Sequence, residues 1–382
     1  MTRYRHRAGE LLVHADDCAA IHAELAEFGY HPAGGTGALR RFTGSRPVPE
    51  VLAALGPGGA SPNHLFGLDR IIWNDLRPKS TWDTLDLTPA GDISLRVGVI
   101  DTGIVLRDGV PHEFLRERVC FEPEDTARVV YDEHGNPAGS AAHGSFVAGV
   151  VLKQVPPEVG VRMKGAIDEE SGDVEDLAVA NAIDALNAEG ITLINLSFSG
   201  ATWEDKPPKA IEDALRRLPQ HAVVVASAGN RGTRQRVYPA GFKLAATVGG
   251  RPDEDHVKVV AVGSVDTSHD PAKPPVADFS NFGPWISAYA NGVDVTGPYF
   301  WPGCPAQRHS DEPDFNGYAV WSGTSFSAAI VTGQIAAKMH ETRGSARAAA
   351  DALLNDAEKI CVWDVNGKLE RPFVRGVPEP GE

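Results

Sequence analysis

Short apolar segments alternate with amphipathic segments through the middle of the chain, and this alternation limits the possible folds more than any other feature. The apolar segments have the length of β-strands and are predicted at Leu95–Ile100, Val161–Ala166, Thr192–Leu196, Ala222–Ser227 and Lys258–Val262. Between them, Val174–Glu189 and Ala210–Leu218 carry apolar residues at helical spacing. Strands that are apolar on both faces need helices on both sides, which predicts an α/β fold with a mostly parallel sheet.

The first 70 residues are predicted to form a small α+β domain of their own. Three strands and two helices are expected in it, at Glu10–His14, Asp17–Phe28, Ala38–Thr43, Pro47–Leu55 and Asn63–Leu68. Residues 32–37 are rich in glycine and are expected to form a loop. Residues 71–92 are interpreted as a linker that lies on the main domain, which spans residues 93–360.

The last part of the chain is predicted to contain two helices, at Ser325–Thr342 and Ser345–Glu358. Residues 361–382 are predicted to form a hairpin and a tail, with the turn at Asn366-Gly367. The segment Tyr299–Gly317 is rich in proline and glycine and is expected to be a surface loop.

Composition narrows the class of protein. The 382 residues carry a formal net charge of −15, and 42% of them are apolar. That apolar fraction is sufficient for the cores of about two domains. The acidic charge argues against nucleic acid as a partner and slightly favours a basic polypeptide, although an acidic surface that keeps the protein soluble is the ordinary explanation.

The amino-terminal region and the cysteines bear on localisation. The basic first residues are not followed by an apolar run, because Leu11–Val13 is interrupted by His14–Asp17. Neither a signal peptide nor a membrane-spanning segment is therefore expected. The four cysteines are far apart and indicate neither a zinc site nor a disulfide framework: Cys18, Cys120, Cys304 and Cys361. We expect a cytoplasmic protein with no membrane partner and no cofactor.

Ser325 lies between a run of small residues and a helix-compatible run of alanine, isoleucine and valine. A serine at a helix N-terminus has an outward-facing backbone N–H in a region that favours negative charge. This placement suits the nucleophile of an acyl transfer, because the serine's own N–H can bind the developing oxyanion. The alternative is that Ser325 only caps the helix, which is a common use of serine.

Three other polar residues occupy positions that could complete such a site. Asp101 follows an apolar strand, His143 begins a small-residue run, and Asn230 ends another apolar strand. Aspartate, histidine and serine in this chain order form one known arrangement of the catalytic triad. For each residue taken alone, a purely structural role is the alternative.

These four segments resemble the sequence blocks of the subtilisin-like serine proteases (subtilases). The blocks are Asp101-Thr102-Gly103, His143-Gly144-Ser145, Ala228-Gly229-Asn230 and Gly323-Thr324-Ser325. The resemblance covers roughly residues 93–355 and implies a subtilisin-like three-layer fold for a catalytic domain at residues 93–360. Ser145 replaces the usual threonine and Phe326–Ala329 replaces the usual Met-Ala-x-Pro, but neither change removes a group that the chemistry needs.

The resemblance also implies the role of each residue. Ser325 would be the nucleophile, His143 the base and Asp101 the group that orients the base. Asn230 and the N–H of Ser325 would bind the oxyanion. No metal is implied, because the calcium loop of many subtilases is reduced here to a short connection in which Glu158 is the one carboxylate.

One further segment resembles the substrate-binding strand of the family. It consists of Leu196, Ser197, Phe198, Ser199 and Gly200, and it would bind the peptide as an added β-strand. A plain buried strand is the alternative. Ser199 stands where the family more often has glycine, which implies a narrower pocket for a small or medium side chain before the cut.

The resemblance therefore predicts a serine endopeptidase that acts on intracellular protein or peptide substrates. A peptide-processing or macrocyclising transpeptidase, a leader-peptide-removing protease and a catalytically silent binding protein are the alternatives. The N-terminal domain has the position and element order of a subtilase pro-segment, which implies an intramolecular inhibitor and folding aid. The alternative is a domain that recruits a leader peptide. We expect the chain to stay intact, or to be cut between Phe66 and Trp82.

Overall fold

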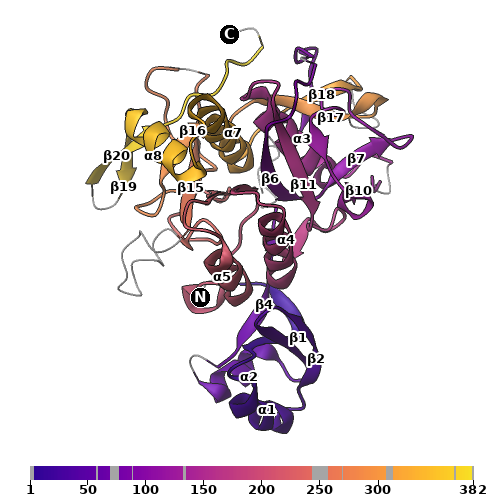
Figure 1. Cartoon of the computed structure of the whole chain (residues 1–382), viewed down its shortest axis with the longest axis vertical. Helices are drawn as coiled ribbons and strands as arrows, with labels where there is room; N and C mark the ends of the chain where they lie inside the picture. Colours follow the sequence, from indigo (N-terminus) through magenta and orange to yellow (C-terminus); the bar gives the residue numbers. More distant parts are fainter. Residues whose placement is uncertain are drawn as a thin grey trace.

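The computed structural model describes residues 4–56, 59–68, 77–87, 89–131, 135–242, 257–268, 270–306, 313–364 and 367–380. A small α+β body at the amino terminus lies against a larger α/β body, as Figure 1 shows. The expected hairpin turn residue Asn366 lies outside the described residues, as do residues 71–76 of the expected linker.

The larger body is built on a sheet with nine described strands in the order β19-β20-β16-β15-β14-β13-β6-β11-β9. The pairs from β9 to β20 are parallel, and β19 and β20 form an antiparallel hairpin. The strands are β6 (Leu95–Asp101), β9 (Val119–Cys120), β11 (Val159–Gly165), β13 (Leu193–Leu196), β14 (Val223–Ser227), β15 (Lys258–Val265), β16 (Ala288–Asn291), β19 (Glu358–Asp364) and β20 (Gly367–Phe373).

Helices cover both faces of this sheet, as the alternating sequence pattern predicts. On one face lie α3 (His143–Lys153) and α7 (Thr324–Thr342), with α8 (Ala346–Asp356) packed on α7. On the other face lie α4 (Asp176–Ala188) and α5 (Lys209–Arg217). These helices place two of the predicted site residues, because α3 begins at His143 and Ser325 is in the first turn of α7.

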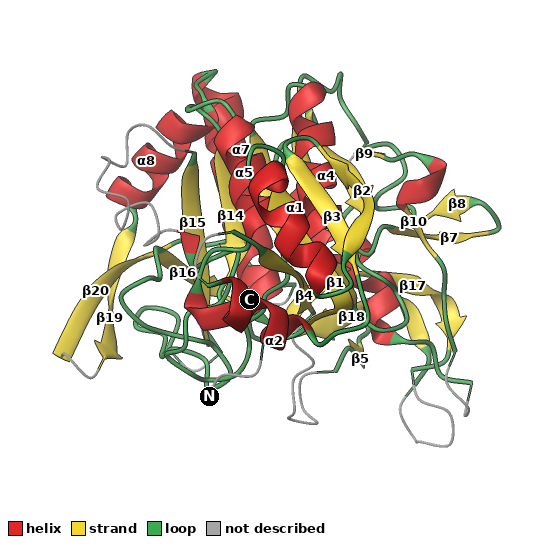
Figure 2. Cartoon of the chain, turned by 90° about the horizontal axis from the view of Figure 1, so that it is seen from below, coloured by secondary structure: helices red, strands yellow, loops and turns green. Residues whose placement is uncertain are grey.

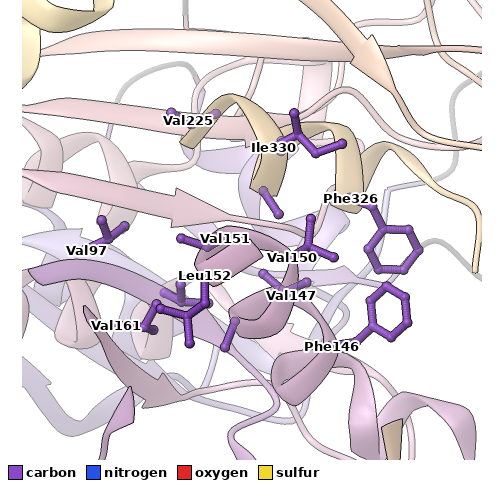
Figure 3. Packing of buried hydrophobic residues seen from close by; sticks show 14 of the residues in the cluster. Val97, Phe146, Val147, Val150, Val151, Leu152, Val161, Val225, Phe326 and Ile330 are labelled. Carbon is purple, nitrogen blue, oxygen red and sulfur yellow. The ribbon is translucent and has the colours of Figure 1, made fainter. Parts of the chain in front are cut away.

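Alternate residues of one strand enter two separate cores. Val97 and Val99 of β6 pack in the core with α3 and α7, whereas Ile100 packs in the core with α4 and α5. Figure 3 shows the first core where α3 and α7 meet, with the ring centroids of Phe146 and Phe326 4.6 Å apart. This double burial explains why these strands are apolar throughout.

The small body is a sheet with two helices on its outer face (Figures 1 and 2). Its strand order is β12-β4-β1-β3-β2. Its own elements are β1 (His6–His14), α1 (Cys18–Glu27), β2 (His31–Thr36), β3 (Leu39–Thr43), α2 (Val48–Leu55) and β4 (Ser61–Gly67). The inner face of the sheet contributes Leu12, Leu39 and Phe66 to the core that contains α4 and α5.

Two sequence expectations about this region are wrong. Residues 32–37, expected to be a loop, contain strand β2, because a register shift between Pro32 and Gly35 lets this glycine-rich segment pair with β3. Val174, expected at the start of a helix, lies in strand β12 (Asp173–Glu175), which the larger body adds to the sheet of the small one. The helix begins only at Asp176, after a polar-apolar-polar triplet that suits a strand.

The expected surface loop at Tyr299–Gly317 is also wrong. Strands β17 (Val295–Cys304) and β18 (Phe315–Trp321) form an antiparallel hairpin there, although residues 307–312 lie outside the described part. The hairpin is anchored by buried rings, since Tyr299 stacks edge-on against Phe315. A short strand from the expected linker, β5 (Lys79–Ser80), pairs with the edge of β18.

The remaining elements are short. They are β7 (Ile104–Arg107), β8 (Val110–Pro111), η2 (Pro123–Asp125), β10 (Thr126–Ala127), η3 (Gly139–Ala142) and η4 (Trp203–Asp205). Within the described residues, we find no helix whose length and apolar character would allow it to cross a membrane.

A buried arginine closes the carboxyl end of α3. The guanidinium of Arg118 donates hydrogen bonds of 2.7–3.5 Å to the backbone oxygens of Leu152, Val155, Pro156 and Val159. Burial lowers the pKa of Arg118, and the nearby carboxylate of Glu158 opposes that shift. Leu152 lies in the last turn of α3, whereas Val155, Pro156 and Val159 follow the helix, so this one side chain ties the end of α3 to the connection that leads into β11.

Candidate functional site

An aspartate and a histidine meet where β6 ends and α3 begins. Nδ1 of His143 donates a hydrogen bond of 2.7 Å to Oδ1 of Asp101, since a carboxylate can only accept. The backbone N–H of Thr102 donates to the same oxygen at 2.8 Å, and the hydroxyl of Thr102 accepts from the N–H of Gly144. Asp101 is 0% exposed and His143 3% exposed. The pairing fixes the imidazole tautomer, with the proton on Nδ1.

Two aromatic rings enclose the imidazole. Trp321, the last residue of β18, stands perpendicular to His143 with ring centroids 5.4 Å apart. Phe326 of α7 lies on another side at 5.7 Å. Sequence reasoning gave neither ring a role in the site. Trp321 comes from the β17–β18 hairpin and Phe326 from the first turn of α7, and both elements lie beside α3.

Ser325 is connected to the end of β13 by two reciprocal hydrogen bonds. Its Oγ donates to the backbone oxygen of Ser197 at 3.0 Å, and Oγ of Ser197 donates to the backbone oxygen of Ser325 at 3.0 Å. Asn195 donates to Ser197, and Thr332 of α7 donates to Asn195. This buried chain of polar groups ties α7 to β13 and therefore fixes the backbone of the serine.

Asn230 is held by the residue that precedes the serine. Its Oδ1 accepts hydrogen bonds from both the N–H and the hydroxyl of Thr324, each 2.8 Å long. These bonds set the orientation of the amide, so that Nδ2 is directed away from Thr324. The amide nitrogen Nδ2 lies beside Gly323, two residues before Ser325. A Cβ added to Gly323 would be 3.6 Å from this nitrogen.

The predicted substrate segment is part strand and part loop. Leu196 ends β13, and the next four residues follow it outside any strand. Ser199 exchanges two backbone hydrogen bonds of 3.0 Å with Gly67, the last residue of β4. Phe198 is buried against Phe66, and Gly200 pairs with the backbone of Tyr238. The structure therefore brings the end of the N-terminal body onto the segment expected to bind substrate.

A second strand borders the same position, and sequence reasoning missed it. Strand β12 pairs with the other edge of β4, and the N–H of Leu68 donates to the backbone oxygen of Gly172 at 3.0 Å. The end of β4 is thus held between β12 and Ser199. The signal in the sequence is a turn glycine followed by the alternating triplet Asp173–Glu175, of which Val174 and Glu175 fall within the predicted helix.

These groups together suit nucleophilic catalysis. They supply a hydroxyl at a helix N-terminus, an imidazole of fixed tautomer and an oriented amide donor. Strand edges on both sides of β4 could hold an extended peptide. Within the described ranges, no cluster of three or more histidine, cysteine, aspartate or glutamate residues could hold a metal ion.

The chain is similar in sequence to known proteins. The sequence profile of the subtilase family matches residues 93–373. A thermophilic serine proteinase from Bacillus sp. (strain AK1) is 27% identical over 322 residues, which cover 79% of this chain and 67% of the relative.

Solved structures are similar over different shares of the chain. Fervidolysin from Fervidobacterium pennivorans, a keratinolytic enzyme related to subtilisin, matches with a TM-score of 0.62 at 18% identity, over 99% of this chain and 62% of its own. A cold-adapted subtilisin-like serine proteinase matches with a TM-score of 0.51 at 19% identity, over 82% of this chain and 98% of its own. The prenylagaramide maturation protease PagA has a TM-score of 0.50 at 24% identity, over 70% and 86% of the two chains.

Proposed function

The chain belongs to the subtilase family and is a subtilisin-like serine endopeptidase, and from this we propose that Ser325, His143 and Asp101 hydrolyse peptide bonds in polypeptide substrates. The observation that carries the proposal is the buried 2.7 Å hydrogen bond between His143 and Asp101, beside the helix that carries Ser325 in its first turn. The predicted α/β class with a subtilisin-like fold is confirmed. That the substrates are intracellular stays a prediction.

Each group has one task in the proposed reaction. His143 Nε2 takes the proton of Ser325 Oγ as that oxygen attacks the substrate carbonyl carbon, and Asp101 stabilises the imidazolium. Asn230 Nδ2 and the N–H of Ser325 bind the negative oxygen of the tetrahedral intermediate. The C–N bond then breaks as His143 returns the proton to the leaving amine, and water cleaves the acyl-enzyme by the same steps.

The bound peptide would help to release the nucleophile. In the structure, Ser325 Oγ donates to the carbonyl of Ser197. A peptide strand in the register of β4 would donate a backbone N–H to that same carbonyl, just as Gly67 donates to the carbonyl of Ser199. Competition for Ser197 would free the Ser325 hydroxyl to turn toward His143.

We also propose that the N-terminal body inhibits the catalytic domain in the intact chain. The support is the position of β4, whose last residues occupy the place of a substrate strand between β12 and Ser199. A domain that only recruited a leader peptide would have no need to fill this cleft. If the chain cuts itself, we expect the site between Phe66 and Trp82.

The test compares the full-length wild type with Ser325→Ala and His143→Ala. We expect both variants to fold and to lose hydrolysis of a peptide library, and a phosphonate serine probe to label only a chain that keeps Ser325. Activity in either variant within about tenfold of the wild type would contradict the proposal. Mass spectrometry of the products separates hydrolysis, which adds water to each cut, from transpeptidation, which joins fragments.

A further inference from the structure

Two arginines of the N-terminal body neutralise the two carboxylates of β12. Arg5 donates two hydrogen bonds, of 2.6 and 2.7 Å, to the carboxylate of Asp173. Arg7 contacts the carboxylate of Glu175 at 2.5 Å. Both arginines come from the amino-terminal end of the chain around β1, so their side chains reach across β4 to arrive at β12. The positive charges therefore lie over β4, above the position that a substrate strand would occupy.

Strand β4, which lies between β12 and β1, leaves room for the guanidinium groups. Asp173 is directly opposite Gly67 and Glu175 is opposite Leu65, so each pair shares one face of the sheet. A Cβ added to Gly67 would lie 2.7 Å from the guanidinium nitrogen Nη2 of Arg5 and 3.1 Å from Oδ1 of Asp173. The guanidinium of Arg5 thus fills the space that a side chain at the Gly67 position of β4 would otherwise occupy.

The register relates these positions to the bond that is cut. Gly67 is opposite Ser199, and Ser325 Oγ contacts the carbonyl of Ser197. In a peptide held in the same register, the residue two places beyond the Gly67 position is opposite Ser197 and next to the nucleophile. The Gly67 position is then the third residue before the cleaved bond, and the Leu65 position is the fifth.

We propose that Asp173 and Glu175 select polypeptide substrates that carry basic side chains at the third and fifth positions before the cleaved bond. This inference rests on the proposed function. In the intact chain, Arg5 and Arg7 take the place of those substrate side chains. Once the N-terminal body leaves, the two half-buried carboxylates lose their arginine partners. A lysine or arginine of the substrate restores the charge-assisted hydrogen bonds.

The fourth residue before the cleaved bond, between the two basic positions, requires a different kind of side chain. Successive side chains of a strand point to opposite faces, so the fourth residue before the bond points away from both carboxylates. In the intact chain this position is Phe66, which is buried against Phe198. A basic side chain there would meet an apolar surface. The alternation basic, apolar, basic is therefore the pattern that this cleft fits.

The two carboxylates could instead serve only to dock the N-terminal body, and the chain offers a matched control for that reading. Oδ2 of Asp213 of α5 lies 2.7 Å from Nε2 of His14 of β1, a contact that also joins the two bodies. It lies on a helix and not on a strand that borders the cleft. Asp213→Asn weakens docking without changing β12.

The experiment uses the full chain and pairs of peptides that differ only by lysine or norleucine at the third, fourth or fifth position. Both peptides of a pair meet the same fraction of chains whose cleft is open, so this fraction cancels in the ratio of their kcat/KM values. We expect the wild type to prefer lysine about 3–10-fold at the third and fifth positions and not at the fourth, as for partly exposed charge-assisted contacts. About 0.5 M sodium chloride should reduce this preference.

The variants assign the preference to single residues. Asp173→Asn should bring the ratio at the third position close to one and preserve the ratio at the fifth. Glu175→Gln should do the opposite, and Asp213→Asn should preserve both. Equal ratios in wild type, Asp173→Asn and Glu175→Gln would overturn the inference, as would a loss of selectivity in Asp213→Asn alone.

A binding measurement separates failure of the inference from failure of the proposed function. Fluorescence anisotropy of the same labelled peptides on the Ser325→Ala chain reads their relative affinity without cleavage. If neither the wild type nor the Leu12→Ala chain, in which the docking contact is weakened, cuts any peptide, the proposed function is contradicted, and the lysine preference in binding still decides the inference. Equal binding of lysine and norleucine peptides would overturn it.

Discussion

The amide of Asn230 shows how a neighbouring residue can fix one side chain for a single task. Its oxygen accepts two hydrogen bonds from Thr324, so the orientation of the donor nitrogen does not depend on substrate. A donor that is already oriented can stabilise a developing negative charge without reorganising at the moment of reaction. Thr324 therefore connects the position of this donor to the turn that carries the nucleophile.

We expect Asn230→Ala to lower kcat by about 10²–10³ with little change in KM, which is the loss associated with one oxyanion donor in a subtilase. The reason is that the donor contacts the oxygen chiefly when it is charged. Steady-state kinetics with a peptide anilide measure both constants, and Asn187→Ala on the surface of α4 is the control. A loss confined to KM would make Asn230 a substrate-binding residue.

A second residue-scale prediction concerns His112, which follows β8 and packs on Tyr318 of β18. Burial lowers the pKa of His112 to about 4, and a backbone hydrogen bond to Gly317 partly opposes that shift. Its Nδ1 accepts a hydrogen bond from the N–H of Phe114, which a protonated nitrogen cannot do. The folded state therefore holds this imidazole neutral.

The sign of the pH effect follows from the depressed pKa. The unfolded chain has a histidine pKa near 6.5, so it binds the proton that the folded chain excludes. Stability is fully present above about pH 6.5 and falls by up to about 3 kcal/mol as the pH approaches 4. We expect His112→Gln to lose less stability between pH 7 and pH 4 than the wild type, measured by Tm. The exposed His31→Gln should behave as the wild type does.

At this scale the sequence supplied the candidate residues. Asp101, His143, Ser325 and Asn230 were predicted because their four blocks resemble those of the subtilases, and the structure joins His143 to Asp101 by a hydrogen bond. Trp321 could not be placed beside His143, because that contact depends on a hairpin whose proline-rich sequence favours a loop.

At the scale of elements, Arg118 holds the end of the helix that begins with His143. Replacing the guanidinium removes every hydrogen bond that this buried charged group donates to the backbone. We expect Arg118→Met to cost about 3 kcal/mol and to lower Tm by roughly 5 °C. Arg116→Met, the same substitution at an exposed site two residues earlier, should have little effect. Equal melting temperatures for the two variants would show that the guanidinium is not needed.

The elements that sequence reasoning missed are those whose strand pairing is supplied by distant residues. Strand β12 is three residues long and forms against β4, more than a hundred positions away in the chain. Strand β2 consists largely of proline and glycine, which disfavour strands, and its pairing with β3 overrides that preference. Local patterns predicted the long apolar strands well, because burial on both faces leaves a continuous signal.

At the scale of the whole molecule, the inhibition proposed above predicts that the docked N-terminal body limits access to the substrate segment. Leu12 of β1 is fully buried in the core that contains α4 and α5, so its side chain belongs to the contact between the two bodies. A buried leucine replaced by alanine loses about 2–5 kcal/mol. We therefore expect Leu12→Ala to raise the rate of peptide hydrolysis by at least about tenfold.

Continuous assays on the full chain measure that rate. Glu24→Ala, on the exposed side of α1, is the control because it leaves the contact intact. Unchanged hydrolysis in Leu12→Ala would mean that docking does not limit access to the cleft, and the inhibitor proposal would then fail. The division of the chain near residue 70 into an N-terminal domain and a catalytic domain stays a prediction. Strand β12 was not predicted, because it lies in the larger body and pairs with β4 of the small one.

The arginine at the end of α3 has a consequence for the surroundings in which this enzyme works. The oxygens of Leu152, Val155, Pro156 and Val159 converge on one cation, as they could on a calcium ion. A bound metal ion stabilises a protein by an amount that varies with its supply, whereas the charge of Arg118 is covalently attached and always present. The stability of the fold around Arg118 therefore does not depend on the concentration of divalent ions. We expect chelation to leave Tm unchanged; a fall of more than about 10 °C would reveal a metal ion bound elsewhere.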